Sequence, residues 1–129
     1  MCNDGKLQVG AVGWRDLTVE NAEEVRDFYK RVIGWQSSDV EMDGYSDFSM
    51  IVPESGQAIA GVCHARGPNK DIPPQWLLYF IVEDVDQSAR TCESLGGKIL
   101  VGPKRMGEGA FCVIEDPAGA VCALYNPGN

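Results

Sequence analysis

Histidine is almost absent from this chain, since His64 is the single histidine among 129 residues. A metal centre built mainly from imidazole ligands is therefore excluded. None of the five cysteines belongs to a C-x-x-C pair, so neither a zinc ribbon nor a redox dithiol is indicated. We expect reduced thiols that mostly fill small core positions in a cytoplasmic protein.

Long apolar runs and clustered basic residues are also missing. No apolar stretch approaches the roughly 20 residues that span a bilayer, and residues 1–6 contain no apolar segment of a secretory signal. The chain has 11 basic and 19 acidic side chains, a net charge of −8, and its only adjacent basic pairs are Lys30-Arg31 and Lys104-Arg105. We therefore expect neither nucleic acid nor a membrane as a partner.

A strand followed by an amphipathic helix is predicted twice. Residues 9–19 and 75–82 are strand-like, and residues 21–33 and 84–95 have the apolar spacing of helices with one buried face. The stripe predicted for the first helix contains Ala22, Val25, Phe28, Tyr29, Val32 and Ile33. The stripe predicted for the second contains Val85, Ala89, Cys92 and Leu95.

The two helices share their end signals. Asn21 and Asp84 are the predicted N-caps, each followed after three residues by a Glu or Gln, which is the capping-box spacing. Gly34 and Gly97 are the predicted stops. Each landmark lies 63 residues from its equivalent, which indicates an internal duplication.

Three more strands are predicted after each helix, so each half is β-α-β-β-β. They cover residues 35–41, 45–52 and 57–64 in the first half, and 98–101, 110–115 and 120–125 in the second. The predicted fold is α+β, with module 9–66 and module 75–127 joined by the Gly- and Pro-rich linker 67–74 in a single domain. We expect the halves to pack together as one curved sheet with a concave cleft on the face away from the helices.

Alternation assigns the strand faces. Leu17 and Val19 are predicted on the helix side, opposite Trp14, Asp16 and Thr18. In the second half Leu78, Phe80 and Val82 take the helix side, and Leu77, Tyr79 and Ile81 take the other.

The pattern resembles the vicinal oxygen chelate superfamily, which includes glyoxalase I, bleomycin resistance proteins and extradiol dioxygenases. Three segments carry the resemblance: Phe28-Tyr29 with Val32-Ile33-Gly34-Trp35, then Val82-Glu83-Asp84-Val85-Asp86, then Glu115-Asp116-Pro117-Ala118-Gly119. The chain is most similar to the glyoxalase-like subgroup with a tryptophan opening each half, here Trp14 and Trp76. The resemblance implies the tandem fold and a homodimer.

Metal-dependent members of that superfamily hold a divalent ion with His, Gln and Glu on the concave strands. The resemblance places these positions on Trp14, on Ala60 or Gly61, on Leu77, and on Ala123 or Leu124. None of these side chains can coordinate a metal. We therefore predict no metal and no cofactor at the superfamily's usual position.

The remaining candidates for a ligand-binding site are polar and aromatic. They are Trp14, Asp16, His64, Trp76, Leu77, Tyr79, Ala123 and Tyr125. Trp14, Trp76 and Tyr79 form either an aromatic wall for a planar or cationic ligand or a packing cluster. Asp16 is either a ligand contact or an exposed strand residue, and Tyr125 either closes the cleft or packs.

His64 is the one group that titrates near neutrality without a large shift. If Ala60 faces the cleft then His64 does too, as a polar anchor or general base oriented by Asp16, whereas a slip by one residue puts Cys63 there instead. The other interpretation is a solvated histidine at a strand end. Residues 102–109, a loop bracketed by glycines, are either a lid that brings Lys104 or Arg105 to an anionic ligand or an ordinary hairpin.

The favoured function is binding of a small organic molecule in the cleft without a metal, as in bleomycin resistance proteins. The alternative is a metal-independent lyase or isomerase that uses His64, Asp16 and Tyr79 as acid–base groups. A third hypothesis is a scaffold or regulatory module with a degenerate site.

Overall fold

The computed structural model describes residues 8–128 of the chain. In this part it contains two α-helices and eight β-strands, so the predicted α+β class is confirmed. The chain divides into two compact units. The N-terminal unit is Arg15–Trp76, and the C-terminal unit comprises residues 8–14 and 77–128 of the described chain. None of the helices within residues 8–128 has the length and apolar character needed to cross a membrane.

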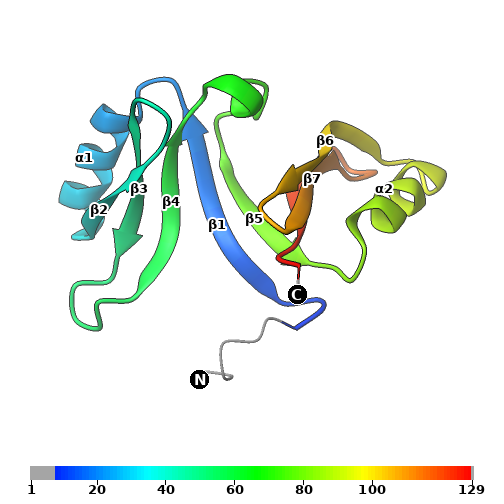
Figure 1. The fold of residues 1–129 in the computed structure, drawn as a ribbon, viewed down its shortest axis with the longest axis horizontal. Coiled ribbons are helices and arrows are strands. Elements are labelled where there is room, and N and C mark those ends of the chain that lie inside the picture. Colours follow the sequence, from blue (N-terminus) through cyan, green and yellow to red (C-terminus); the bar gives the residue numbers. More distant parts are fainter. Residues whose placement is uncertain (1–7, 129) are drawn as a thin grey trace. The chain divides into compact units, whose positions relative to one another are not determined.

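The N-terminal unit contains one helix and four strands (Figure 1). They are β1 (Val12–Val19, which begins in the C-terminal unit), α1 (Ala22–Ile33), β2 (Gln36–Glu41), β3 (Ser46–Ile51) and β4 (Ala58–His64). The strand order is β2-β3-β4-β1. The strands β1 and β4 are parallel, and β3 runs antiparallel to both β2 and β4. A short 3-10 helix, η1 (Gly67–Asn69), lies in the predicted linker.

The C-terminal unit repeats this connectivity. Its elements are β5 (Trp76–Ile81, whose first residue belongs to the N-terminal unit), α2 (Val85–Ser94), β6 (Lys98–Met106), β7 (Gly109–Glu115) and β8 (Val121–Asn126). The order is β5-β8-β7-β6, with β5 and β8 parallel and the other pairs antiparallel. In both units the strand before the helix pairs in parallel with the last strand, which confirms the predicted tandem β-α-β-β-β modules.

The predicted helix ends are partly confirmed. Asp84 caps α2, because its carboxylate accepts a hydrogen bond from the Gln87 N–H at 3.1 Å. Asn21 is the N-cap residue of α1, as predicted, but its side chain makes no hydrogen bond to the helix backbone and instead donates to Glu24 Oε1 at 3.1 Å. Gly34 ends α1 at φ 94°, as predicted. In the second unit Gly96, rather than Gly97, has the left-handed conformation, at φ 95°.

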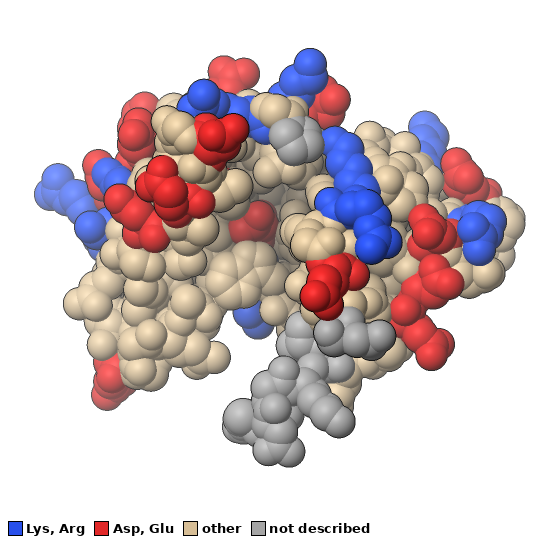
Figure 2. Space-filling view, in the orientation of Figure 1, with Lys and Arg blue, Asp and Glu red and all other residues tan. Residues whose placement is uncertain are grey.

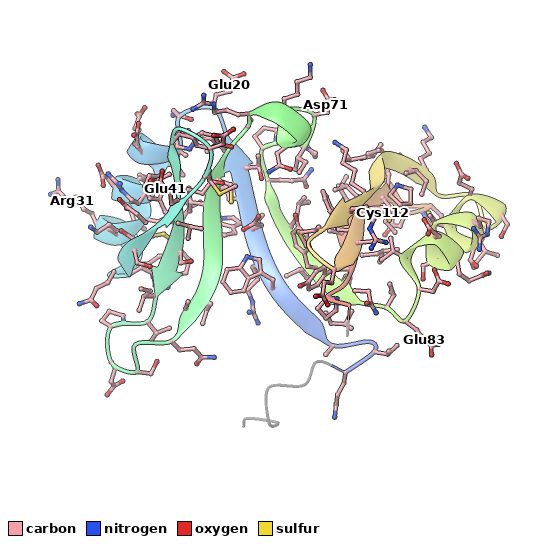
Figure 3. The ribbon with its side chains drawn as sticks, viewed as in Figure 1. Glu20, Arg31, Glu41, Asp71, Glu83 and Cys112 are labelled. Atoms are coloured by element: carbon pink, nitrogen blue, oxygen red, sulfur yellow. The ribbon has the colours of Figure 1, made fainter. Side chains whose placement is uncertain are left out.

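Each helix packs on one face of the sheet in its own unit. In the N-terminal unit the core consists of Ala22, Phe48, Met50, Ala60 and Val62. In the C-terminal unit it consists of Val85, Ala89 and Cys112 (Figure 3), with Val82 and Leu124 packed against it. The faces predicted for Val19 and Val82 are confirmed, since both side chains pack against these clusters.

The apolar stripes were predicted too wide. Phe28, Val32 and Ile33 of α1 are 55%, 62% and 52% exposed, and Leu95 after α2 is 72% exposed. Only the side of α1 that carries Ala22, Val25 and Tyr29 turns toward the core. The reason is geometric, because only the part of each apolar stripe that contacts the sheet is buried, and that contact is narrower than the stripe.

Residues 102–109 belong to a hairpin, which is the second of the two alternatives predicted, but its turn is confined to residues 107–108 and the rest is strand. Strand β6 continues to Met106, so that Lys104 pairs with Phe111 and Arg105 pairs with Ala110. The register shifts between Val101 and Lys104, around Gly102 at φ 81°. The Gly-Pro sequence therefore marks an irregularity within a strand, and Lys104 and Arg105 lie in that strand and not in a free loop.

Candidate functional site

The sheet face opposite α2 in the C-terminal unit is apolar and aromatic. The register pairs Tyr79 with Ala123 and Ile81 with Tyr125, so these side chains share one face. Strand β7 adds Phe111 opposite Tyr125 and Val113 opposite Ala123. The prediction that Tyr79 lies on the side away from the helix is confirmed.

Three aromatic rings meet on this face. The Tyr79 centroid lies 6.4 Å from that of Phe111 with an interplanar angle of 37°, and 6.4 Å from that of Tyr125 with an angle of 80°. Tyr79 and Phe111 are each 6% exposed, whereas Tyr125 is half-buried. Leu77 and Ala123 are fully buried beside them. Such a face offers dispersion and edge-to-face contacts, with phenol hydroxyls as its polar groups. Trp14, on β1, belongs to the same unit and is half-buried.

Trp76 lies in a different aromatic cluster from the one predicted. Its indole Nε1–H donates to the Tyr29 hydroxyl at 3.0 Å, and its ring lies 5.4 Å from Tyr29 and 5.9 Å from Trp35. All three residues belong to the N-terminal unit, and Trp76 and Trp35 pack against its helix-side core. The described contacts of Trp76 are thus packing contacts between α1 and the sheet.

His64 lies on the helix side of β4, which corrects the prediction that it faces the cleft. Its neighbours by alternation, Ala60 and Val62, are both in the core cluster, and its ring lies 6.0 Å from that of Phe48. The carboxylate that binds His64 is Asp47, a residue the sequence did not single out. Asp47 Oδ1 accepts from the His64 backbone N–H at 2.9 Å and lies 3.1 Å from Nδ1.

The Asp47–His64 pair is enclosed. The side chains of His64 and Asp47 are 11% and 6% exposed. Tyr45 covers the imidazole edge-on at 5.3 Å, and Arg66 stacks over Tyr45 at 4.0 Å. An imidazole held in this way connects β3 and β4, and its contacts are those of a structural residue. The signal that could have revealed the pair is Asp47 itself, a charged residue inside a strand that is otherwise apolar or small.

The one-residue slip puts Cys63 on the face away from α1. Asp16 pairs with Gly61, so Asp16 and Cys63 lie on the same face, and Cys63 Sγ donates to Asp16 Oδ2 at 3.4 Å. Burial above all, and then the carboxylates of Asp16 and Asp47, raise the pKa of the Cys63 thiol. The thiol is therefore protonated at neutral pH, and a protonated thiol is a poor nucleophile.

The residues at the superfamily's metal positions do not fit a metal ion. Ala60 is buried in the helix-side core, Gly61 has no side chain, and Leu77 and Ala123 are buried and apolar. Within residues 8–128, no group of three or more His, Cys, Asp or Glu side chains is arranged to hold an ion.

Two surface cavities lie outside the aromatic face. One, of about 510 Å³, lies at the start of α2 and is lined by Glu83, Asp84, Asp86, Arg105 and Glu108, among others (Glu83 is labelled in Figure 3). The other, of about 320 Å³, lies in the N-terminal unit beside η1 and is lined by Thr18, Asn21, Lys70 and Ile72, among others. Of the ligand contacts considered from the sequence, Arg105 lines the first cavity, and none of the residues predicted for the cleft lines either one.

Residues 10–124 match the family described as Glyoxalase/Bleomycin resistance protein/Dioxygenase superfamily. Anthracycline biosynthesis protein DnrV of Streptomyces peucetius is 31% identical over 92% of this chain and 48% of its own length. Putative glyoxylase CFP32 of Mycobacterium bovis is 27% identical over 93% of this chain and 45% of its own length. The chain thus spans about half the length of these curated relatives.

Among solved structures, methylmalonyl-CoA epimerase from Mycobacterium tuberculosis superposes with a TM-score of 0.53 at 19% sequence identity. The match covers 97% of this chain and 95% of that one. At this identity the likeness concerns the fold alone.

Proposed function

Because the chain belongs to the Glyoxalase/Bleomycin resistance protein/Dioxygenase superfamily, we propose that it binds a small planar organic molecule without a metal ion. The binding surface is the sheet face of the C-terminal unit opposite α2. The proposal rests on the replacement of the family's metal ligands by apolar and aromatic side chains. Where metal-dependent members have ligands this chain has Trp14, Leu77 and Ala123, and beside the last two stand the rings of Tyr79 and Tyr125.

Stacking and dispersion supply the affinity in this proposal. Tyr125 is the half-buried member of the three-ring group and is the first ring that a ligand contacts. Tyr79 and Phe111 behind it form an apolar floor. Of the predicted ligand contacts the proposal keeps Trp14, Leu77, Tyr79, Ala123 and Tyr125. It assigns no ligand contact to Asp16, His64 or Trp76.

The proposed ligand class is a polycyclic aromatic compound with a cationic group. Two relatives, 31% and 30% identical, have names that place them in anthracycline biosynthesis. Anthracyclines combine a planar ring system with an amino sugar. A net charge of −8 favours the approach of such a cation, and aromatic side chains suit its rings.

The contacts of His64 weigh against the alternative of a metal-independent lyase or isomerase. A general base must reach the proton that it removes, but His64 lies on the helix side under Tyr45 and is bonded to Asp47. The proposal therefore predicts that His64→Ala retains ligand binding. A cytoplasmic location and a homodimer remain part of the proposal. The free thiols of Cys63, Cys92, Cys112 and Cys122 support only the location, and the homodimer is what the family resemblance implies.

Calorimetric titration with daunorubicin tests the proposal. We expect saturable one-to-one binding that is unchanged after treatment of the protein with EDTA. Tyr125→Ala should weaken it about tenfold, through loss of one aromatic contact and its buried area. Tyr45→Ala is the matched control, since Tyr45 is a half-buried tyrosine in the N-terminal unit, and should leave the affinity unchanged. Absence of saturable binding, loss of binding with EDTA, or equal effects of the two substitutions would refute the proposal.

A further inference from the structure

The cavity beside η1 in the N-terminal unit combines apolar walls with charged and hydrogen-bonding groups. It has a volume of about 320 Å³, and every residue that lines it belongs to Arg15–Trp76. No residue of the proposed aromatic binding surface lines it. The apolar walls consist of Val19, Ala65, Ile72 and Pro74. This cavity is therefore a candidate for a second binding site, with its own ligand.

Thr18 provides a buried hydrogen-bonding group to this cavity. The residue is 2% exposed, and its side chain makes no hydrogen bond within residues 8–128. No fully enclosed side-chain oxygen in the described chain lacks a partner, so Thr18 Oγ1 reaches accessible space, and Thr18 lines this cavity. Since buried hydroxyls in proteins normally have partners, an open hydroxyl beside apolar walls indicates a ligand with a polar group.

Two opposite charges border the same cavity without being paired. Glu20 and Lys70 both line it and are exposed. Neither forms an ion pair with the other or with any residue in the described part of the chain. Asn21 adds an acceptor beside Glu20, because its Nδ2 donates to Glu24 and leaves Oδ1 open. A ligand that matches this cavity carries a negative and a positive group.

The charged rim is visible in two views. Figure 3 shows Glu20 and Asp71, the residue after Lys70, projecting at the same edge of the N-terminal unit. Figure 2 shows acidic and basic side chains together at this edge. Asp71 is exposed and is not among the residues that line the cavity. The ammonium of Lys70 is thus the basic group available inside it.

We propose that this cavity binds a free, zwitterionic α-amino acid with an apolar side chain. The ligand carboxylate pairs with the Lys70 ammonium, and the ligand ammonium pairs with the Glu20 carboxylate and Asn21 Oδ1. The Thr18 hydroxyl completes the polar contacts, and the apolar side chain packs against Ile72. An amino acid carries both charges on neighbouring atoms, so it bridges two groups that the protein itself leaves unpaired. A simple carboxylate or amine leaves one of them unmatched.

Calorimetric titration with L-leucine tests this proposal. We expect saturable one-to-one binding. Isocaproate lacks the ammonium of leucine and isoamylamine lacks its carboxylate, so each should bind about tenfold more weakly or worse, as for the loss of a charge-assisted contact. Absence of saturable leucine binding, or equal binding of either analogue, overturns the proposal.

Two substitutions locate the binding in this cavity. Lys70→Met removes the ammonium and should weaken leucine binding about tenfold, and Thr18→Val removes the hydroxyl at nearly constant size and should weaken it about fivefold. Lys30→Met is the matched control, because Lys30 is an exposed lysine of the same unit outside the cavity, and should leave the affinity unchanged. Circular dichroism checks that the variants are folded.

Equal effects of the two lysine substitutions, or a folded Thr18→Val variant that binds leucine like the wild type, refute the assignment. Lys70 lies on the exposed rim, so Lys70→Met remains decisive if Thr18→Val does not fold. Daunorubicin binding should be the same in Lys70→Met and the wild type. A failure of this proposal is thereby distinguished from a failure of the proposed function.

Discussion

Replacement of Asp47 should cost far more stability than replacement of an exposed carboxylate, although the residue touches no proposed ligand. Asp47, taken as a whole residue, is 4% exposed. Its Oδ1 accepts the His64 backbone N–H at 2.9 Å and lies 3.1 Å from Nδ1. In Asp47→Ala these groups of His64 stay buried without their acceptor, at roughly 1–3 kcal/mol each. For the two groups together we therefore expect a loss of about 2–6 kcal/mol in the free energy of unfolding.

Urea unfolding at neutral pH, followed by tryptophan fluorescence, measures this loss. Asp47→Asn keeps one acceptor oxygen and should lose about 2 kcal/mol. Asp43→Ala removes an exposed carboxylate before β3 and should change the free energy by less than about 0.5 kcal/mol. A loss below about 1 kcal/mol for Asp47→Ala would show that the enclosed pair does not stabilise the N-terminal unit, and the structural assignment of His64 would fail with it.

Three further predictions concern the caps of the two helices, a glycine in β7 and a buried thiol. Asp84→Ala should destabilise the protein by about 1 kcal/mol and Asn21→Ala by clearly less, since only the Asp84 side chain bonds to the backbone of its helix. Equal losses of stability in thermal unfolding of the two variants would contradict this prediction. Gly109→Ala should lower the free energy of unfolding by about 3 kcal/mol, because a Cβ at this position collides with the backbone at the end of β8. Gly107 has open space around it, so Gly107→Ala should cost only the about 1–2 kcal/mol of a side chain at positive φ. Equal losses for the two variants in urea unfolding would be inconsistent with the collision. Burial raises the pKa of Cys112 from 9.0 to about 11. The folded state therefore holds a proton that the unfolded state has lost, and stability should fall as pH rises from 9.0 to about 11. The slope approaches about 1.4 kcal/mol per pH unit for this thiol, and an unchanged slope in Cys112→Ala would refute the assignment.

The sequence alone determined the features that depend on local periodicity. Alternation along residues 75–82 placed Tyr79 on the side away from the helix, and the register with Ala123 confirms it. The capping pattern at Asp84 and the stop at Gly34 are encoded within a few residues. The repeated order of these signals was enough to predict the tandem modules, because each module is built from short-range preferences repeated once.

The tertiary structure decided what depends on register and on partners distant in the chain. A shift by one residue moves every side chain of a strand to the other face. Only the pairing of Leu17 with Val62 therefore puts Val62 and His64 on the helix side and Cys63 beside Asp16. Asp47 binds His64 across 17 residues of sequence, and no local pattern encodes such a bond. Strand β6 continues past Gly102 because β7 supplies hydrogen-bonding partners there. The exposure of Phe28, Val32 and Ile33 on α1 also depends on tertiary structure. The strands that the helix packs against lie elsewhere in the chain, and they determine how much of its apolar stripe is buried.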